Sequence, residues 1–231
     1  MKKNKIMCIS PHPDDEILGC GGSLLKAKEE KYDIYLCYLS YGEGSSPKLT
    51  QNKLKKIRKA ESLEVCKELG LKDNSVFYLE IGDNKIDHNN FNNFKKLMSI
   101  IRNVRPDIVF IPDEKDSYND HQEAALLAKR CLDMAGSNNF LKKNEQPWWV
   151  GNILVYEVST PLSDYQYAVD ISSFIDKKIS LLSIYKSQTK NEGNVSDLIG
   201  DKAKYLSGYR AAFSVGEYRE VFRVLRVNNI I

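Results

Sequence analysis

The chain has 231 residues, 42% of them hydrophobic and 28% charged, which is an ordinary composition for a globular domain with a substantial core. Lys and Arg number 34 against 31 Asp and Glu, so the net charge of +3 is too small to predict a nucleic-acid partner. No stretch reaches the roughly 18 to 20 apolar residues of a membrane span, and the apolar run after the basic N-terminus is too short for a signal peptide, so we expect a cytoplasmic protein.

Strands and helices are predicted to alternate through most of the chain. An apolar run over Ile6–Ser10 ends at a proline and indicates a buried strand. Apolar residues at helical spacing follow over Ile17–Lys31, and a second strand is expected over Asp33–Ser40. The next expected elements are a loop over Tyr41–Pro47, a helix over Leu49–Leu69 closed by Gly70, a strand over Ser75–Glu80, a helix over Phe91–Val104, a strand over Asp107–Ile111, a helix over His121–Ala135 and a strand over Ile153–Val158.

The C-terminal third is less regular, with a helix expected over Phe174–Tyr185 and a terminal strand or short helix over Tyr218–Val227. The repeated alternation before it predicts an α/β fold: a Rossmann-like, mostly parallel sheet with helices on both faces. No linker marks a boundary, so residues 1–231 are expected to form a single domain. Ligands bind such sheets at the carboxyl ends of the strands, where the polar segments 11–16 and 113–121 fall.

Two of the three histidines lie in acidic clusters at predicted strand ends. His12 is followed by Asp14, Asp15 and Glu16, and His121 is preceded by four acidic residues between positions 113 and 120. Two histidines and a carboxylate form the open ligand set of a catalytic zinc site. A second carboxylate beside it can take a proton from water and pass it to a leaving amine. The alternative interpretation is that these residues cap helices and form turns.

A pair of motifs carries a family resemblance. His-Pro-Asp-Asp-Glu follows the first predicted strand, and Asp-His opens a later helix. Together they resemble the PIG-L/LmbE-like family of zinc-dependent N-acetylglucosamine deacetylases. Weaker matches follow in the family's order over nearly the whole chain: Arg58 and Glu61 before Leu69-Gly70, Gly82-Asp83, Tyr156-Glu157, Val169–Ser172, Lys177-Lys178, Tyr185–Gln188, Gly208 and Glu217–Phe222.

The resemblance implies a metal-dependent N-deacetylase that acts on a small-molecule amino-sugar substrate. It implies that His12, Asp15 and His121 are the zinc ligands and that Asp14 is the general base. Two histidines and one aspartate also suit other divalent ions, so the native metal stays open. The acyl group, the sugar's partner and the oligomeric state stay open too, and a homo-oligomer is compatible with the sequence.

The resemblance also implies roles around the metal site. Arg58 and Asp83 would bind sugar hydroxyls or neighbouring substrate groups. From the residues alone, Arg58 is equally well an exposed helix charge paired with Glu61, and Asp83 a turn residue. We interpret Glu16 as a residue with a structural role, either capping the next helix or holding a ligand in place.

One departure from the family pattern lies opposite the expected ligands. Where the family often has His-x-Asp-His, this chain has Tyr118-Asn119-Asp120-His121. A tyrosine hydroxyl can donate a hydrogen bond to an oxyanion, but it carries no positive charge at neutral pH, since its ordinary pKa is about 10. Tyr118 is therefore a candidate oxyanion donor. Asp120, which would orient a histidine at position 118, is instead expected to hold His121 from behind.

Four further interpretations concern other features of the sequence. The Tyr118 departure allows a non-catalytic or weakly active sugar- or metal-binding relative. Gly19-Cys20-Gly21-Gly22 hints at nucleotide binding, but its spacing and the acidic loop before it disfavour that function. Trp148-Trp149 and the loop over Tyr41–Pro47 are candidates for shaping a sugar pocket, although core packing is favoured for the tryptophans. The five cysteines include no CxxC pair and are expected to be free thiols.

Overall fold

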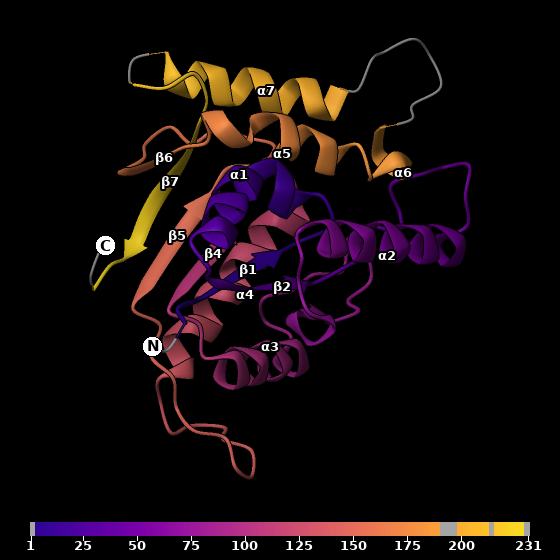
Figure 1. Cartoon of the computed structure of the whole chain (residues 1–231). Coiled ribbons are helices and arrows are strands. Elements are labelled where there is room, and N and C mark those ends of the chain that lie inside the picture. Colours follow the sequence, from indigo (N-terminus) through magenta and orange to yellow (C-terminus); the bar gives the residue numbers. More distant parts are fainter. Residues whose placement is uncertain (1–2, 190–197, 213–214, 229–231) are drawn as a thin grey trace.

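The computed structural model of the protein describes residues 3–189, 198–212 and 215–228 and is built on one sheet (Figure 1). The sheet has seven strands in the order β3-β2-β1-β4-β5-β7-β6. Its strands are β1 (Lys5–Ser10), β2 (Asp33–Tyr38), β3 (Val76–Tyr78), β4 (Ile108–Pro112), β5 (Asn152–Tyr156), β6 (Tyr167–Asp170) and β7 (Arg219–Arg226). The helices are α1 (Asp15–Glu29), α2 (Gln51–Glu68), α3 (Phe91–Val104), α4 (Asn119–Ala135), α5 (Ile175–Leu182), α6 (Lys186–Thr189) and α7 (Leu198–Ala211).

The sheet is mostly parallel. The pairs from β3 through β2, β1 and β4 to β5 are all parallel, and β7 runs antiparallel to both β5 and β6. The carboxyl ends of the five parallel strands therefore meet at one edge. This arrangement confirms the predicted α/β fold with helices on both faces.

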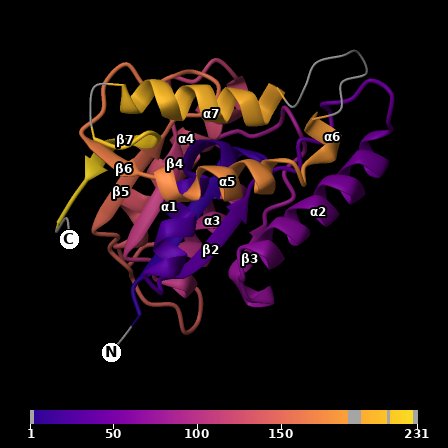
Figure 2. The ribbon, with the colours of Figure 1, turned by 45° about the horizontal axis from the view of Figure 1, so that its top comes forward.

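Two layers of helices cover the sheet. Helices α3 and α4 pack on one face, while α1, α2 and α5 pack on the other, with α7 outside α5 (Figures 1 and 2). Strand β1 contributes to both cores, because Ile6 and Cys8 face the α1 layer whereas Met7 and Ile9 face the α3 and α4 layer. Burying each such aliphatic side chain contributes roughly 1.5 to 3 kcal/mol. The strand is therefore held on both faces, and so is the turn that follows it.

Helix α1 is broken near its middle. The φ of −142° and ψ of 20° at Cys20 are not helical. Beyond the break, the Glu220 carboxylate on β7 accepts hydrogen bonds from the backbone N–H groups of Gly22 (2.8 Å) and Ser23 (2.7 Å), and Lys178 Nζ lies 2.7 Å from the same carboxylate. The amides that the break frees thus have a buried acceptor. They are not available to a phosphate, which argues against the nucleotide-binding interpretation.

Several expected elements differ in extent from those observed. Helix α1 begins at Asp15, two residues before the expected start, and the segment expected as a strand or short helix at the C-terminal end is strand β7. Strand β6 and helix α7 were not expected. In the part of the chain that the structure describes, no helix combines the length and the apolar character needed to cross a bilayer.

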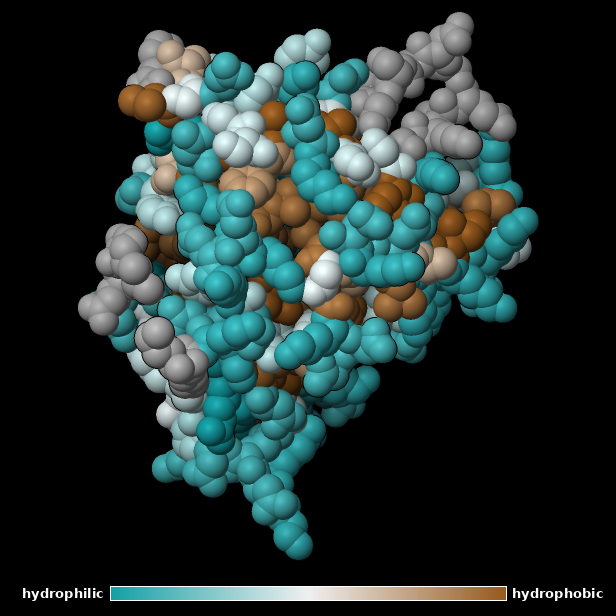
Figure 3. Space-filling view, viewed as in Figure 1, coloured by the Kyte–Doolittle hydropathy of each residue, from teal (hydrophilic) through white to brown (hydrophobic). Residues whose placement is uncertain are grey.

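The surface in the view of Figure 1 is mainly hydrophilic. Hydrophobic residues show near the centre of this face, and hydrophilic side chains divide them into small areas (Figure 3). Isolated apolar areas of this kind are normal on a folded protein.

Candidate metal centre

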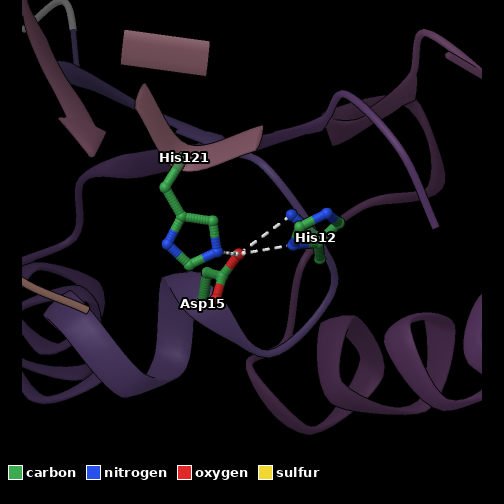
Figure 4. A group of neighbouring side chains, drawn as sticks. All are labelled: His12, Asp15 and His121. Atoms are coloured by element: carbon green, nitrogen blue, oxygen red, sulfur yellow. Dashed lines mark hydrogen bonds and ion pairs between the residues drawn. The ribbon is translucent and has the colours of Figure 1, made fainter. Parts of the chain in front are cut away.

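Three potential metal ligands converge where β1 and β4 end. His12 lies in the turn between β1 and α1, Asp15 is the first residue of α1, and His121 lies in the first turn of α4. Their side chains point toward one another (Figure 4). The positions are far apart in sequence but close in space because β1 and β4 are parallel neighbours.

The spacing of these three side chains suits a metal ion. Asp15 Oδ2 lies 3.3 Å from His12 Nδ1 and 3.5 Å from His121 Nε2, and the three potential ligand atoms lie within 4.8 Å of one another. These separations exceed the roughly 2.7 to 2.9 Å of a charge-assisted hydrogen bond. Ligand atoms about 2.0 to 2.1 Å from a tetrahedral zinc ion lie roughly 3.3 Å apart, so the donor set fits such an ion. We call His12, Asp15 and His121 the primary cluster.

Each histidine of the primary cluster has a carboxylate behind it. Asp120 Oδ2 lies 3.2 Å from His12 Nε2, and Asp116 Oδ1 lies 3.2 Å from His121 Nδ1. The expectation that Asp120 holds His121 is therefore corrected, since its partner is His12. Consecutive helical residues point in directions about 100° apart, so Asp120 turns toward the β1 turn while His121 faces the cluster. Carboxylates in these positions fix the tautomer and orientation of a ligating histidine.

Asp116, which contacts His121, was not singled out from the sequence. It is 1% exposed, and its Oδ2 also accepts hydrogen bonds from the backbone N–H groups of Ser159 (2.8 Å) and Thr160 (3.1 Å). The Tyr118 N–H donates to Oδ1 at 3.1 Å. Its place in an acidic run before His121 was the available signal, but four acidic residues in that run competed for the role.

Asp14 lies beside the primary cluster in an uncommon backbone conformation, with a φ of 115°. Its N–H donates to Glu16 Oε2 at 3.0 Å, and its Oδ1 accepts a hydrogen bond from Arg58 at 3.1 Å. Burial raises the pKa of Asp14, the Arg58 charge lowers it, and the result is about 6. A carboxyl group that titrates near neutral pH is well suited to taking and releasing a proton.

Arg58 supports this turn from within the protein. Its side chain is 2% exposed and donates to the carbonyl of Pro13 as well as to Asp14. It also lies 3.4 Å from Ser45 Oγ in the loop after β2. The interpretation of an exposed helix charge is therefore wrong, and these contacts favour a role in positioning Asp14 over direct contact with a sugar.

The contacts of Glu16 fit the structural role expected for it from the sequence. Its side chain is fully buried, and Oε1 accepts hydrogen bonds from the hydroxyls of Tyr38 (3.0 Å) and Tyr185 (2.6 Å). Burial raises its pKa to about 7, although the Tyr185 hydrogen bond acts in the opposite direction. Because its other oxygen accepts a hydrogen bond from the Asp14 N–H, Glu16 supports the turn that carries Asp14.

The ionisation of the primary cluster reflects the carboxylates around it. Burial lowers the pKa of His12, but hydrogen bonds to neighbouring carboxylates, first Asp120, leave it well above its usual value. The pKa of His121 is raised because Asp15 and Asp116 outweigh its burial. Burial raises the pKa of Asp15, yet the two histidines bring it down to about 2. A metal bound by these histidines would compete with protons for their ring nitrogens.

The remaining predicted residues, Tyr118 and Asp83, lie beside the two histidines of the primary cluster. Tyr118 is 62% exposed, and its ring centroid lies 5.4 Å from that of His121. Asp83 Oδ1 lies 3.3 Å from His12 Nε2, and Asp83 Oδ2 accepts a hydrogen bond from the Gly44 N–H at 2.8 Å. The loop after β2 therefore borders the site through Gly44.

The aromatic residues considered for a pocket lie elsewhere. Trp148 Nε1 donates to the carbonyl of Pro106, which lies before the amino end of β4. Trp149 stacks on Arg226, at the end of β7 that pairs with the start of β5. Both tryptophans are thus at the opposite edge of the sheet. A cavity of about 650 Å³ beside α1 is lined by none of the primary cluster residues.

The N-terminal half of the chain matches a known family model. Residues 7–132 match the model described as "PIG-L: GlcNAc-PI de-N-acetylase". The matched range contains the primary cluster, Asp14, Arg58, Asp83 and Tyr118.

Individual relatives include two kinds of enzyme. The chain is 27% identical over 193 residues to the diacetylchitobiose deacetylase of Thermococcus kodakarensis, covering 80% of this chain and 70% of that protein. It is 28% identical over 194 residues to the 4-oxalmesaconate hydratase of Pseudomonas putida, covering 79% and 73%. Among solved structures, the N,N'-diacetylchitobiose deacetylase of Pyrococcus horikoshii matches with a TM-score of 0.82 and 25% identity, covering 96% of this chain and 84% of that one.

Proposed function

Because the chain belongs to the PIG-L family, we propose that it is an N-deacetylase that hydrolyses the acyl amide of an amino sugar. Water adds across the amide, which breaks the C–N bond and releases a carboxylic acid and a free amine. The substrate would be a small glycoconjugate or sugar-containing metabolite, in keeping with the deacetylases among its relatives. An N-acetyl group is the first candidate for the acyl group.

The observation that carries this proposal is the primary cluster with Asp14 beside it. His12, Asp15 and His121 would hold the metal, with zinc as the first candidate and other divalent ions as alternatives. When bound, such an ion supplies Lewis acidity that polarises a water molecule and the amide carbonyl.

The chain's own residues would move the protons. Asp14 would act as general base, taking a proton from the attacking water and delivering it to the leaving nitrogen. Arg58 and Glu16 keep Asp14 in place through the contacts at 3.1 Å and 3.0 Å. Because burial raises the pKa of Asp14 to about 6, its carboxyl group can both accept and return the proton.

Tyr118 and Asp83 would complete the site on the substrate side. The exposed Tyr118 hydroxyl is available to donate a hydrogen bond to the oxyanion. Asp83, at the end of its loop, would accept hydrogen bonds from sugar hydroxyls. We further infer a cytoplasmic enzyme, because Cys8, Cys20 and the other three cysteines are all free thiols.

The direct test combines metal analysis with an assay of amine release. Purified protein would be stripped of metal, reloaded with zinc, and incubated with N-acetylglucosamine and N,N'-diacetylchitobiose, and free amine would be measured. We expect zinc-dependent release from at least one acylated sugar. Zinc binding without release from a broad panel of acylated sugars would reject the enzyme function and favour a non-catalytic sugar- or metal-binding relative.

A second activity is worth measuring in the same preparation. The 28% identity to a hydratase shows that a related protein adds water to a different kind of substrate. Parallel incubation with 4-oxalmesaconate, followed by ultraviolet absorbance, would detect hydration. Hydration without amine release would replace the deacetylase proposal.

A further inference from the structure

The cavity of about 650 Å³ beside α1 is a separate site from the metal centre. Its walls come from the C-terminal half of α1 and from strands β4, β5 and β6. Asn4, Asp107 and Asn152, which precede or begin β1, β4 and β5, also line it. The cavity therefore extends toward the amino ends of the strands, at the sheet edge opposite to the primary cluster. Its volume lies within the roughly 300 to 1,000 Å³ of sites for small organic ligands.

Aromatic residues form much of this cavity. Phe110 on β4 and Tyr167 on β6 line it, and both pack against Phe222 of β7, with ring centroids 5.2 and 6.2 Å from that of Phe222. Tyr32, between α1 and β2, is a third lining aromatic residue. Phe110 is buried, whereas Tyr32 and Tyr167 are half-buried. Aromatic faces carry partial negative charge, so such a wall suits a cation as well as an apolar group.

The charged residues that line the cavity are mostly acidic. Among the described residues they are Glu30, Asp107 and Asp170 against Lys26, which leaves an excess of negative charge. Glu30 lies close to the aromatic wall, since burial raises the pKa of Tyr167 and the neighbouring Glu30 carboxylate raises it further. An anionic ligand would be repelled by this excess, and a neutral ligand would gain little from it.

We propose that this cavity binds a small organic cation, with its ammonium group beside the carboxylates and aromatic rings and its apolar body on the sheet. Ile108, Leu154 and Val169 line the cavity and are only partly buried, so an apolar body would cover side chains that water reaches in the free protein. Binding at this site does not depend on the proposed deacetylase function, because no residue of the primary cluster lines the cavity.

Titration calorimetry of the purified protein with benzyltrimethylammonium tests the proposal. This cation should bind at least about tenfold more tightly than benzyl alcohol, which has the same ring without a charge, and phenylacetate should bind more weakly still. Glu30→Gln and Tyr167→Ala should each weaken binding of the cation about 2- to 30-fold. The matched control is Glu29→Gln, because Glu29 is an exposed carboxylate next in sequence that does not line the cavity, and its affinity should be unchanged.

Two calorimetric results would overturn the proposal. One is binding of the cation no tighter than that of benzyl alcohol at millimolar concentrations. The other is an equal loss of affinity in Glu29→Gln and Glu30→Gln.

Anomalous diffraction from crystals soaked in (4-bromobenzyl)trimethylammonium gives the answer even if Tyr167→Ala fails to fold. A bromine peak between α1 and β6 supports the site, whereas a peak only elsewhere, or no peak, refutes it. Neither experiment uses zinc or an acylated sugar, so absence of deacetylation would not alter these results.

Discussion

Asp14 is the residue whose chemistry depends most on its surroundings. Its carboxyl group has a pKa raised to about 6, and it acts as a base only when ionised. The value of kcat/KM should therefore rise with pH up to about 6 and then level off, losing about tenfold for each pH unit below it. A bound cation nearby favours the ionised carboxylate, so the rising limb should lie at or below this pH. Initial rates from pH 4 to 9 would locate it.

The variant Asp14→Asn tests the same role of Asp14 as a base. The variant should lower kcat about 10²- to 10⁴-fold and remove the acidic limb of the pH profile. Its metal content should match that of the unmodified chain, because Asp14 is outside the primary cluster. Full turnover in this variant would mean that another group serves as base.

Asp116 is predicted to control metal affinity without touching the metal. Its two oxygens face His121 Nδ1 on one side and the Ser159 and Thr160 amides on the other. Asparagine has one acceptor oxygen and cannot serve both sides, so Asp116→Asn should weaken zinc binding about 10- to 100-fold in calorimetry. Asp164→Asn, at an exposed position, is the control. Equal zinc affinities in the two variants would contradict the role of Asp116.

Tyr118→Phe tests the oxyanion donor. Removing one such donor typically costs about 10²- to 10³-fold in kcat. The side chain is 62% exposed, so the melting temperature should not change. If kcat is also unchanged, Tyr118 has no part in the reaction and the oxyanion has another donor.

The sequence predicts some of these residues better than others. His12 and His121 could be brought together from sequence because both follow parallel strands, whose carboxyl ends share an edge. The choice of Asp15 over Asp14 as a ligand came from the family resemblance, since both carboxylates lie within three residues of His12. The sequence does not show which histidine Asp116 contacts and which Asp120 contacts. The answer depends on the direction in which each side chain points from α4 and from the turn before it.

At the scale of elements, the start of α1 is held by close contact with β5. A Cβ added at Gly19 would overlap the ring of Tyr156 and lie 2.8 Å from the carbonyl oxygen of Glu157. Gly19→Ala should therefore destabilise the protein by about 1 to 3 kcal/mol in denaturant unfolding. Gly208→Ala in α7 is the matched control, because its nearest contact would be 3.7 Å away. Equal free energies of unfolding for the two variants would show that α1 can move away from β5 without loss of stability.

The elements that the sequence predicts and the elements that it does not predict differ in the spacing of their apolar residues. Helix α3 has the predicted bounds, because large buried residues such as Phe94, Leu97 and Ile101 repeat at helical spacing. Helix α7 buries small residues instead, including Ala203, Ser207 and Ala211, which leave no strong apolar period. Strand β6 has four half-exposed or exposed residues, too few for a recognisable alternation.

At the scale of the whole molecule, metal binding should be linked to folding. The primary cluster joins the β1 turn, α1 and α4, and these segments are brought together only in the folded state. Zinc at a hundred times its Kd should stabilise the fold by about 2.7 kcal/mol, or roughly 5 to 10 °C in melting temperature. His12→Ala should abolish this shift. An equal shift in that variant would place the stabilising zinc outside the primary cluster.

Strand β7 has a consequence for how the protein is made. It lies between β5 and β6, and Glu220 on it caps the broken helix α1, yet a ribosome makes it after every other described element. While translation proceeds, β6 has no neighbouring strand and the amides beyond the break in α1 have no acceptor. The nascent chain therefore has an incomplete sheet until β7 has been synthesised. During that interval its unpaired strand edges can be bound by chaperones or can lead to aggregation.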